Sequence, residues 1–390
     1  MAGNESQVDP SEAVRAAVGA VQEPVLRLPI GDLGMVRGIA VDGSTAVVAI
    51  AEPLPDRGHW ARLEDAVRAA GLTVDGVERV DVDLRQMGEG ELPEVARVLK
   101  GEPPPNPLAV VDANAPVHEH PRPRVNPFTN ARTRILAIAS GKGGVGKSSV
   151  TTNLSIALAQ RGRRVAVVDA DVWGFSLPRM LGVTHPPDLI DDVLVPPEVH
   201  GVDVISMGFF TREDEAVVWR GPMLHKALEQ FLTDVHWGDP DYLVIDLPPG
   251  TGDVSISIAQ FLPRAEVVIV TTPQLAAQKV AQRAGVMAAK VNLDVVGVIE
   301  NMSWFRGDDG KRYELFGAGG GGELARRLGV PLLGQIPLVP ALRTGGDEGV
   351  PIVVGAPDDE ASQVFRAVAA RLDTELAPTK RSHPQLRIQS

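Results

Sequence analysis

The sequence predicts a doubly wound, mainly parallel α/β sheet, preceded by a second, smaller α/β domain. Three observations predict this fold. An apolar segment at 134–139 runs into a glycine-rich loop and then into a segment with helical spacing of apolar residues. Apolar runs at 164–168 and 242–245 each end at an aspartate, as strands do at the ligand-binding edge of an open parallel sheet. Two further apolar runs, at 267–273 and 295–300, flank a helical segment and form a βαβ unit.

Length and composition limit the classes of protein to consider. A chain of 390 residues exceeds what one hydrophobic core usually serves, so two domains are expected. The formal net charge of −12 argues against sequence-independent nucleic-acid binding. No apolar run approaches the roughly 20 residues that a membrane span needs, and the polar start does not have the pattern of a signal peptide. We therefore expect a cytoplasmic protein with no membrane contact and no nucleic-acid partner.

Cysteine is absent from the sequence. This excludes disulfides, thiolate nucleophiles and cysteine ligands for a metal ion or cluster within this chain. The eight histidines include no pair at the spacing of metal ligands on a helix. A structural zinc site is therefore not expected.

Residues 10–88 are predicted to form the smaller domain. Its expected elements, in chain order, are a helix at 13–21, strands at 35–41 and 46–50 joined as a hairpin, a helix at 60–70 and an edge strand at 77–84. No catalytic constellation is evident there, so the domain is expected either to contact other proteins or to be a plain accessory domain.

Residues 89–130 are predicted to form a linker. The proline-rich stretches 103–107 and 120–124 do not suit a helix and favour an extended polyproline conformation. The two domains are therefore expected to move relative to each other. The second domain is predicted to span 131–375, and 376–390 to form a flexible tail.

The segment Ser140-Gly-Lys-Gly-Gly-Val-Gly-Lys-Ser-Ser149 has the spacing of a nucleotide phosphate-binding loop. Its glycines permit the tight curl that turns backbone N–H groups toward phosphate oxygens. Lys147 supplies a positive charge to the terminal phosphates, the Ser148 hydroxyl is placed to ligate Mg²⁺, and the following helix points its positive end at the ligand. We expect ATP and Mg²⁺, with the nucleotide bound by Gly141, Lys142, Gly143, Gly144, Val145, Gly146, Lys147, Ser148 and Ser149.

Two aspartates follow neighbouring strands of the predicted sheet. Asp246 ends the run 242–246 in the Walker B pattern, and is expected to hold Mg²⁺. Asp171, in Asp169-Ala-Asp171, is expected to orient the attacking water or to accept its proton. Taken alone, either aspartate could simply cap a strand or a turn. A phosphate-binding loop one strand away favours the catalytic interpretation, with direct attack of water on the γ-phosphate.

The loop sequence resembles the deviant Walker A motif of the family that contains the ParA and MinD partition ATPases, the nitrogenase iron protein and the Mrp-type (ApbC-like) iron–sulfur cluster carriers. In that family the extra lysine, here Lys142, crosses a dimer interface to the partner subunit's nucleotide. The resemblance therefore implies a homodimer that encloses ATP, with Lys142 as a catalytic residue. Without it, Lys142 would be read as a surface lysine.

Later motifs resemble the Mrp-type carriers more closely than ParA or MinD. These motifs are Asp246-Leu-Pro-Pro-Gly-Thr-Gly-Asp253, Thr271-Thr-Pro-Gln274, Glu300-Asn-Met-Ser303, the glycine run 319–322 and Leu333-Gly-Gln-Ile-Pro-Leu338. The smaller domain likewise resembles the iron–sulfur-assembly domain often fused before such ATPases. The resemblance implies contact of Asn301 with the adenine edge, although a turn-forming asparagine is the alternative. It also implies client apoproteins or iron–sulfur assembly proteins as partners.

Such carriers typically have a Cys-x-x-Cys pair shortly after the Glu-Asn-Met-Ser motif, which in a dimer bridges one [4Fe-4S] cluster. This chain has Trp304-Phe-Arg-Gly-Asp-Asp-Gly-Lys-Arg-Tyr313 there, and these side chains do not replace thiolates on iron. We expect an ATP-hydrolysing protein that binds or helps to transfer iron–sulfur clusters, with the cluster ligands absent from this chain. The alternative is a ParA- or MinD-like positioning ATPase that acts as a nucleotide-dependent binding module.

Overall fold

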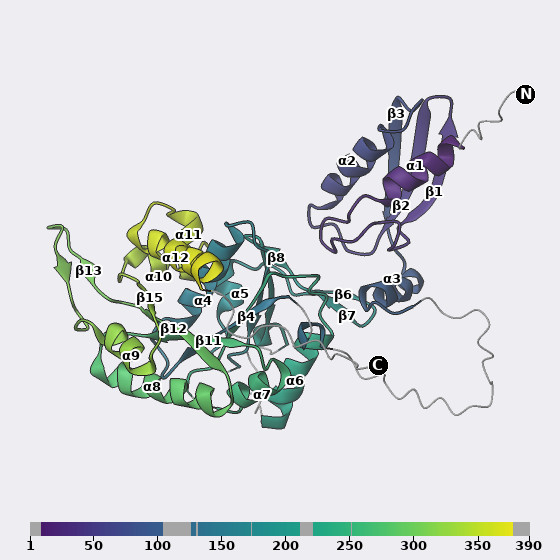
Figure 1. Cartoon of the computed structure of the whole chain (residues 1–390). Coiled ribbons are helices and arrows are strands. Elements are labelled where there is room, and N and C mark those ends of the chain that lie inside the picture. Colours follow the sequence, from purple (N-terminus) through teal and green to yellow (C-terminus); the bar gives the residue numbers. More distant parts are fainter. Residues whose placement is uncertain are drawn as a thin grey trace, which may run out of the picture. The chain divides into compact units, whose positions relative to one another are not determined.

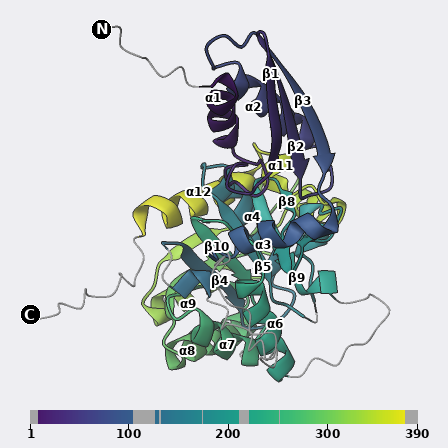
Figure 2. The ribbon, with the colours of Figure 1, turned by 90° about the vertical axis from the view of Figure 1, so that its right-hand side faces the viewer.

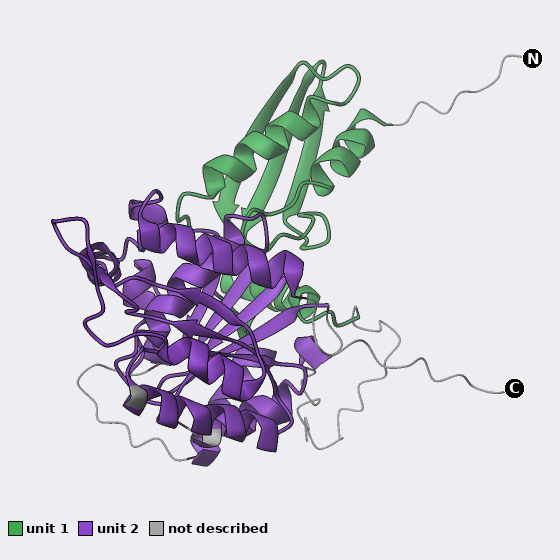
Figure 3. Cartoon of the chain, turned by 60° about the vertical axis from the view of Figure 1, so that its left-hand side comes forward, with its two compact units in different colours: residues 1–123, 188–195, 234–238 green, residues 124–187, 196–233, 239–390 purple. Residues whose placement is uncertain are grey.

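The computed structural model describes residues 9–103, 126–129, 132–172, 174–210, 221–250 and 252–376. The chain forms two compact units, coloured separately in Figure 3. Unit 1 is drawn from residues 1–123, 188–195 and 234–238, and unit 2 from the rest of the chain. Most of the expected linker and nearly all of the expected C-terminal tail lie outside the described residues.

Unit 1 is built on a three-stranded sheet in the order β1-β2-β3. β1 and β2 form an antiparallel hairpin, and β3 pairs with β2 in parallel at the edge. This is the order of helices and strands that the sequence predicts. The elements of unit 1 are α1 (Pro10–Gly19), β1 (Val36–Asp42), β2 (Thr45–Glu52), α2 (Trp60–Gly71), β3 (Arg79–Gln86), η1 (Glu89–Glu91), α3 (Leu92–Leu99), β6 (Asp188–Ile190) and β7 (Val193–Val195).

Unit 1 differs from the sequence interpretation in two places. Residues expected at the start of the linker form η1 and α3, because the apolar face of α3 places Val95 and Ala96 in the core of this unit. The hairpin β6–β7 comes from the middle of the expected ATPase domain. It groups with unit 1 because its three buried side chains, Ile190, Val193 and Val195, join the same core.

Unit 2 contains an eight-stranded sheet in the order β15-β12-β11-β4-β10-β5-β9-β8. All neighbouring strands are parallel except β8, which is antiparallel to β9. β10 lies between β4 and β5 in this order, and Figure 2 labels these three strands and β9 in the same part of unit 2. The strands are β4 (Arg134–Ser140), β5 (Val165–Asp169), β8 (Glu198–Val199), β9 (Val202–Ser206), β10 (Tyr242–Asp246), β11 (Glu266–Thr271), β12 (Asp294–Glu300) and β15 (Leu332–Gln335), with a separate hairpin of β13 (Phe305–Arg306) and β14 (Arg312–Tyr313).

Helices cover both faces of this sheet, which confirms the doubly wound fold. In Figure 1, α4 and α12 lie on one side of the strands, and α6, α7 and α8 lie on the other. The helices are η2 (Pro127–Thr129), α4 (Lys147–Ala159), α5 (Leu177–Leu181), η3 (Met207–Phe210), α6 (Gly221–Thr233), α7 (Asp253–Phe261), α8 (Leu275–Lys290), α9 (Gly320–Leu328), α10 (Pro340–Glu348), α11 (Ile352–Gly355), α12 (Glu360–Ala370) and η4 (Arg371–Glu375). Among the described residues, no helix combines the length and the apolar character needed to cross a membrane.

The central strands are buried on both faces, as a parallel sheet between two helical layers requires. Every residue of β4 is buried, including Arg134 at its start. The Arg134 guanidinium pairs with Glu266 on the neighbouring strand, with a shortest N–O distance of 2.7 Å, and it also donates to the Leu376 carbonyl 2.8 Å away. A buried charge needs such compensation. The hydrogen bond to Leu376 also ties the sheet to the C-terminal end of the described chain.

The packing of α12 on α4 generates a stability prediction. Phe365 is 1% exposed in the core of unit 2, whereas Val286 on α8 is 48% exposed. Phe365→Ala should lower the free energy of unfolding by about 3–5 kcal/mol, because the substitution removes buried apolar surface and leaves a cavity. Urea denaturation followed by circular dichroism measures this change. Val286→Ala is the control, and an equally small effect of both substitutions would contradict the assigned core.

Candidate functional site

The phosphate-binding loop connects β4 to α4 at the carboxyl edge of the sheet. Two of its glycines, Gly144 and Gly146, have left-handed φ angles of 76° and 80°, which glycine adopts without steric cost. Gly141 serves a different purpose. A Cβ atom there would lie 2.4 Å from the backbone nitrogen of Ala281. The loop therefore lies directly against the backbone of α8, and only glycine fits at this contact.

Asp246 organises the start of α4. It is fully buried at the end of β10, one strand from the loop. Its Oδ2 atom lies 2.5 Å from Lys147 Nζ and accepts a hydrogen bond from the Ser148 hydroxyl at 2.6 Å. Its Oδ1 atom accepts a hydrogen bond from the Thr151 hydroxyl at 2.5 Å. Three side chains from the first turns of one helix therefore converge on one carboxylate.

Asp169 is the last residue of β5, and Asp171 lies two residues after it; β5 borders β10 on the side away from β4. Asp171 is 7% exposed, and its Oδ2 atom lies 3.8 Å from Lys147 Nζ. Asp169 is fully buried and accepts hydrogen bonds from the backbone N–H groups of Ser176 and Leu177, at 3.0 and 3.1 Å. Burial, and then the negative charge of Asp246, raises the pKa of the Asp169 carboxyl. Asp169 thus positions the segment before α5, while Asp171 faces the phosphate loop.

A cavity of about 530 Å³ lies over the loop. Its lining includes Lys142, Lys147, Ser148 and Asp171, so all four of these predicted site residues share one space. The Lys142 ammonium lies 3.4 Å from the side-chain oxygen of Gln274, at the start of α8. The structure therefore brings the predicted phosphate, metal and catalytic residues together within one chain.

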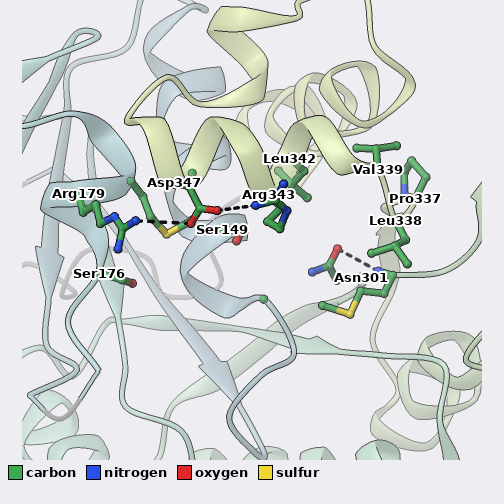
Figure 4. Close-up of a pocket in the computed structure, with 14 residues that line it drawn as sticks. Ser149, Ser176, Arg179, Asn301, Pro337, Leu338, Val339, Leu342, Arg343 and Asp347 are labelled. Carbon is green, nitrogen blue, oxygen red and sulfur yellow. Dashed lines mark hydrogen bonds and ion pairs between the residues drawn. The ribbon is translucent and has the colours of Figure 1, made fainter.

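A second cavity, of about 350 Å³, adjoins the first (Figure 4). The two cavities share Gly146, Ser149, Ser176 and Met180 in their linings. A ligand can therefore extend from the phosphate loop into the second cavity. The combined space is of the size that proteins use for a ligand as large as a nucleotide.

Asn301 lines this second cavity (Figure 4). Its side-chain nitrogen donates to the carbonyl of Val145 at 2.9 Å, and its side-chain oxygen accepts from the N–H of Met302. A Cβ atom at Gly146 would lie 2.2 Å from that nitrogen. Asn301 therefore braces the phosphate loop from the side, and its contact with adenine stays a prediction.

Sequence reasoning did not select two features of the site. Thr151 was missed as a partner of Asp246, although it lies three residues after Ser148 and so shares its face of the helix. The pair Arg179 and Asp347, 3.9 Å apart, lies at the second cavity on α5 and α10 (Figure 4). No sequence signal links these two residues, because they are far apart in the chain and meet only through packing.

Comparisons with known proteins agree with this geometry. Residues 131–373 match the family described as NUBPL iron-transfer P-loop NTPase, and residues 11–83 match the family described as iron–sulfur cluster assembly protein. A Mycobacterium bovis protein named iron–sulfur cluster carrier protein is 45% identical over 374 residues, covering 94% of each chain. A Bacillus subtilis protein of the same name is 42% identical, covering 84% of this chain and 88% of its own.

The chain belongs to the iron-transfer P-loop NTPase family. This confirms the resemblance found in the sequence. A nucleotide-binding protein of Archaeoglobus fulgidus, solved in complex with ADP, has a TM-score of 0.51 and 34% identity, covering 60% of this chain and 91% of its own. The curated relatives carry the name of cluster carriers, so they favour that function over a positioning ATPase.

This member of the iron-transfer family differs from the expected pattern at the segment that follows Glu300-Asn-Met-Ser303. Here the chain forms the hairpin β13–β14 instead of presenting a cysteine pair. The Arg312 guanidinium stacks 4.2 Å from the centre of the Trp304 ring, and both Arg306 and Arg312 pair with Glu360 on α12. The hairpin is thus held by cation–π and ionic contacts.

The contact between α8 and the loop can be tested with two glycine-to-alanine variants. Gly141→Ala should lower the free energy of unfolding of the nucleotide-free protein by about 1–3 kcal/mol, since the added methyl group collides with backbone atoms. Gly143→Ala is the control, because an ideal Cβ there meets nothing within 4 Å. Chemical denaturation of both variants measures the difference. Equal stability would show that the loop does not depend on this contact.

Proposed function

We propose that this chain is a Mg²⁺-dependent ATPase that acts as a homodimer in iron–sulfur cluster transfer, with the cluster held by thiolates of its partners. The main support for ATP hydrolysis is the buried network that joins Lys147, Ser148 and Asp246 below the phosphate loop. The names of the relatives support the part concerning cluster transfer.

The residues around Asp246 fit a magnesium ion. Their donors are hydroxyl and carboxylate oxygens, which Mg²⁺ prefers. Ser148 and Asp246 would hold the ion, and Thr151 fixes the orientation of the Asp246 carboxylate through its other oxygen. When bound, Mg²⁺ neutralises part of the charge on the β- and γ-phosphates. Lys147 exchanges its carboxylate partner for phosphate oxygens when the nucleotide enters.

Hydrolysis proceeds by direct attack of water on the γ-phosphorus. A bond forms from the water oxygen to phosphorus, the bond to the β,γ-bridging oxygen breaks, and ADP and inorganic phosphate leave without a covalent enzyme intermediate. Asp171 orients the water or accepts its proton, a role supported by its place in the cavity lining beside Lys147. Positioning and charge neutralisation supply the catalysis.

Lys142 completes the nucleotide site of the partner subunit. The resemblance of the loop to the deviant Walker A motif supports this role. Within its own subunit Lys142 lines the cavity over the loop, and its contact with Gln274 at 3.4 Å is at the outer limit of a hydrogen bond. The terminal phosphates in its own subunit already have Lys147, so a second ammonium is available to a phosphate that approaches from the other subunit.

The cluster is cargo of the assembly and is not ligated by this chain. Without cysteine, the hairpin β13–β14 offers carboxylates, arginines and a lysine, none of which replaces a thiolate on iron. The ATPase instead serves as a nucleotide-gated scaffold. ATP binding or hydrolysis changes how the dimer binds the proteins that ligate the cluster.

Substitutions of the two lysines of the loop are predicted to have different effects on ATP binding and on turnover. Lys147→Ala should abolish nucleotide binding, because it removes the charge that meets the terminal phosphates. Lys142→Ala should retain ATP binding but lower turnover by at least about a hundredfold, since it removes a cation that acts in the transition state. Calorimetric titration with ATP and phosphate-release assays measure both. Lys290→Ala, an exposed lysine at the end of α8, is the control, and full ATPase activity of either loop variant would refute these roles.

The absence of thiolates predicts the outcome of cluster reconstitution. Anaerobic incubation of the purified protein with iron and sulfide should leave no stoichiometric iron–sulfur chromophore after gel filtration, measured by visible absorption and by iron and sulfide analysis. The Bacillus subtilis relative serves as the comparison protein under the same conditions. A stable cluster on this chain alone would overturn the scaffold proposal while leaving the ATPase proposal intact.

A further inference from the structure

Unit 1 contains a group of three buried polar side chains, Glu23, Glu52 and His59. Their exposed fractions are 0%, 0% and 4%. They come from three separate places in the unit: the turn after α1, the last residue of β2, and the residue before α2. One ligand atom from each residue lies within 4.8 Å of the other two. It is the only such group of metal-ligating side chains among the residues that the structure describes.

The protein backbone fixes one oxygen of each carboxylate. Glu23 Oε2 accepts hydrogen bonds from the N–H groups of Val25, at 2.8 Å, and of Leu26. Glu52 Oε1 accepts one from the N–H of Leu54 at 3.3 Å. The remaining atoms, Glu23 Oε1, Glu52 Oε2 and His59 Nε2, are buried without any hydrogen-bond partner. Buried polar atoms are rarely left unpaired in proteins. We therefore expect a bound partner for these three atoms.

The spacing of the group indicates what that partner is. His59 Nε2 lies 3.6 Å from Glu52 Oε1 and 3.9 Å from Glu23 Oε1, which is too long for hydrogen bonds. Two ligands of a tetrahedral ion with bonds of about 2.1 Å are about 3.4 Å apart. A small cation between the three side chains would therefore need only slight movement of its ligands.

The charge of the group also favours a cation. Two carboxylates, those of Glu23 and Glu52, and one imidazole share the buried interior of unit 1. Buried carboxylates without a cation to balance them are costly, so in proteins they are paired or coordinate a metal ion. A divalent ion would balance both carboxylates while the imidazole stays neutral.

We propose that Glu23, Glu52 and His59 bind one divalent transition-metal ion of the Zn²⁺ type. A donor set of one imidazole and two carboxylates suits zinc, whereas Mg²⁺ and Ca²⁺ prefer oxygen alone and Cu⁺ prefers sulfur. Backbone hydrogen bonds to Glu23 Oε2 and Glu52 Oε1 fix the orientation of both carboxylates, as hydrogen bonds to the ligands do in metal sites. Because its ligands are buried, the ion is structural. It joins the turn after α1, the end of β2 and the start of α2.

This site is independent of the proposed ATPase. It also differs from what the sequence led us to expect, since the histidines show no zinc-binding spacing. The ligands are instead a single histidine and two carboxylates that the fold of unit 1 brings together. The metal-free alternative is a protonated His59 shared between the two carboxylates, and the experiment below separates the two arrangements.

Zinc titration of the full chain tests the proposal. The protein is stripped with EDTA, dialysed, and titrated with ZnCl₂ in excess Mg²⁺ and without nucleotide, using isothermal titration calorimetry. The wild type should bind one Zn²⁺ per chain at this site. His59→Gln and Glu52→Gln should each lower the association constant by at least about a hundredfold, because each removes one of three ligands.

Glu64→Gln is the matched control, because it removes an exposed carboxylate from α2 of the same unit and should leave zinc binding unchanged. Equal zinc binding by the wild type and His59→Gln overturns the proposal. If the ligand variants fail to fold, zinc K-edge X-ray absorption of the zinc-loaded wild type identifies the ligands of the ion and so tests the proposal. One imidazole with oxygen ligands supports the site, and a different ligand set, or no retained zinc, overturns it.

Discussion

The nucleotide site depends on one buried carboxylate. Asp246 is fully buried where β10 ends, and a charge at such a position needs full compensation. It receives that compensation from Lys147, Ser148 and Thr151, all in the first turns of α4. The same contacts fix α4 against β10 and so position the phosphate loop. The side chains that balance the charge of Asp246 therefore also set the geometry of the site.

Neighbouring elements determine the shape of the loop as much as its own glycines do. The backbone of α8 closes on Gly141, and the side chain of Asn301, just after β12, rests on Gly146 and holds the Val145 carbonyl. The loop therefore lies at the carboxyl edge of the parallel strands, where ligands of doubly wound folds bind. This arrangement explains why the two cavities meet at Gly146 and Ser149.

The two units contain different kinds of chemistry. Unit 2 has oxygen donors and ammonium groups suited to a nucleotide and Mg²⁺, while its β13–β14 hairpin is held by arginine contacts with Trp304 and Glu360. Unit 1 has the buried group of Glu23, Glu52 and His59. Neither unit has a thiolate. This absence is the reason for our proposal that thiolates of partner proteins hold the cluster.

The sequence by itself determined the fold class, the order of the main elements and the residues of the phosphate loop, because these follow from local apolar periodicity and from a contiguous motif. Only the tertiary structure decided that Thr151 shares Asp246, that Asn301 braces the loop, that β6–β7 joins the core of unit 1, and that Glu23, Glu52 and His59 meet. Each of these contacts joins residues from separate elements. Side-chain packing and the compensation of buried charge select them, and neither leaves a periodic signal in the chain.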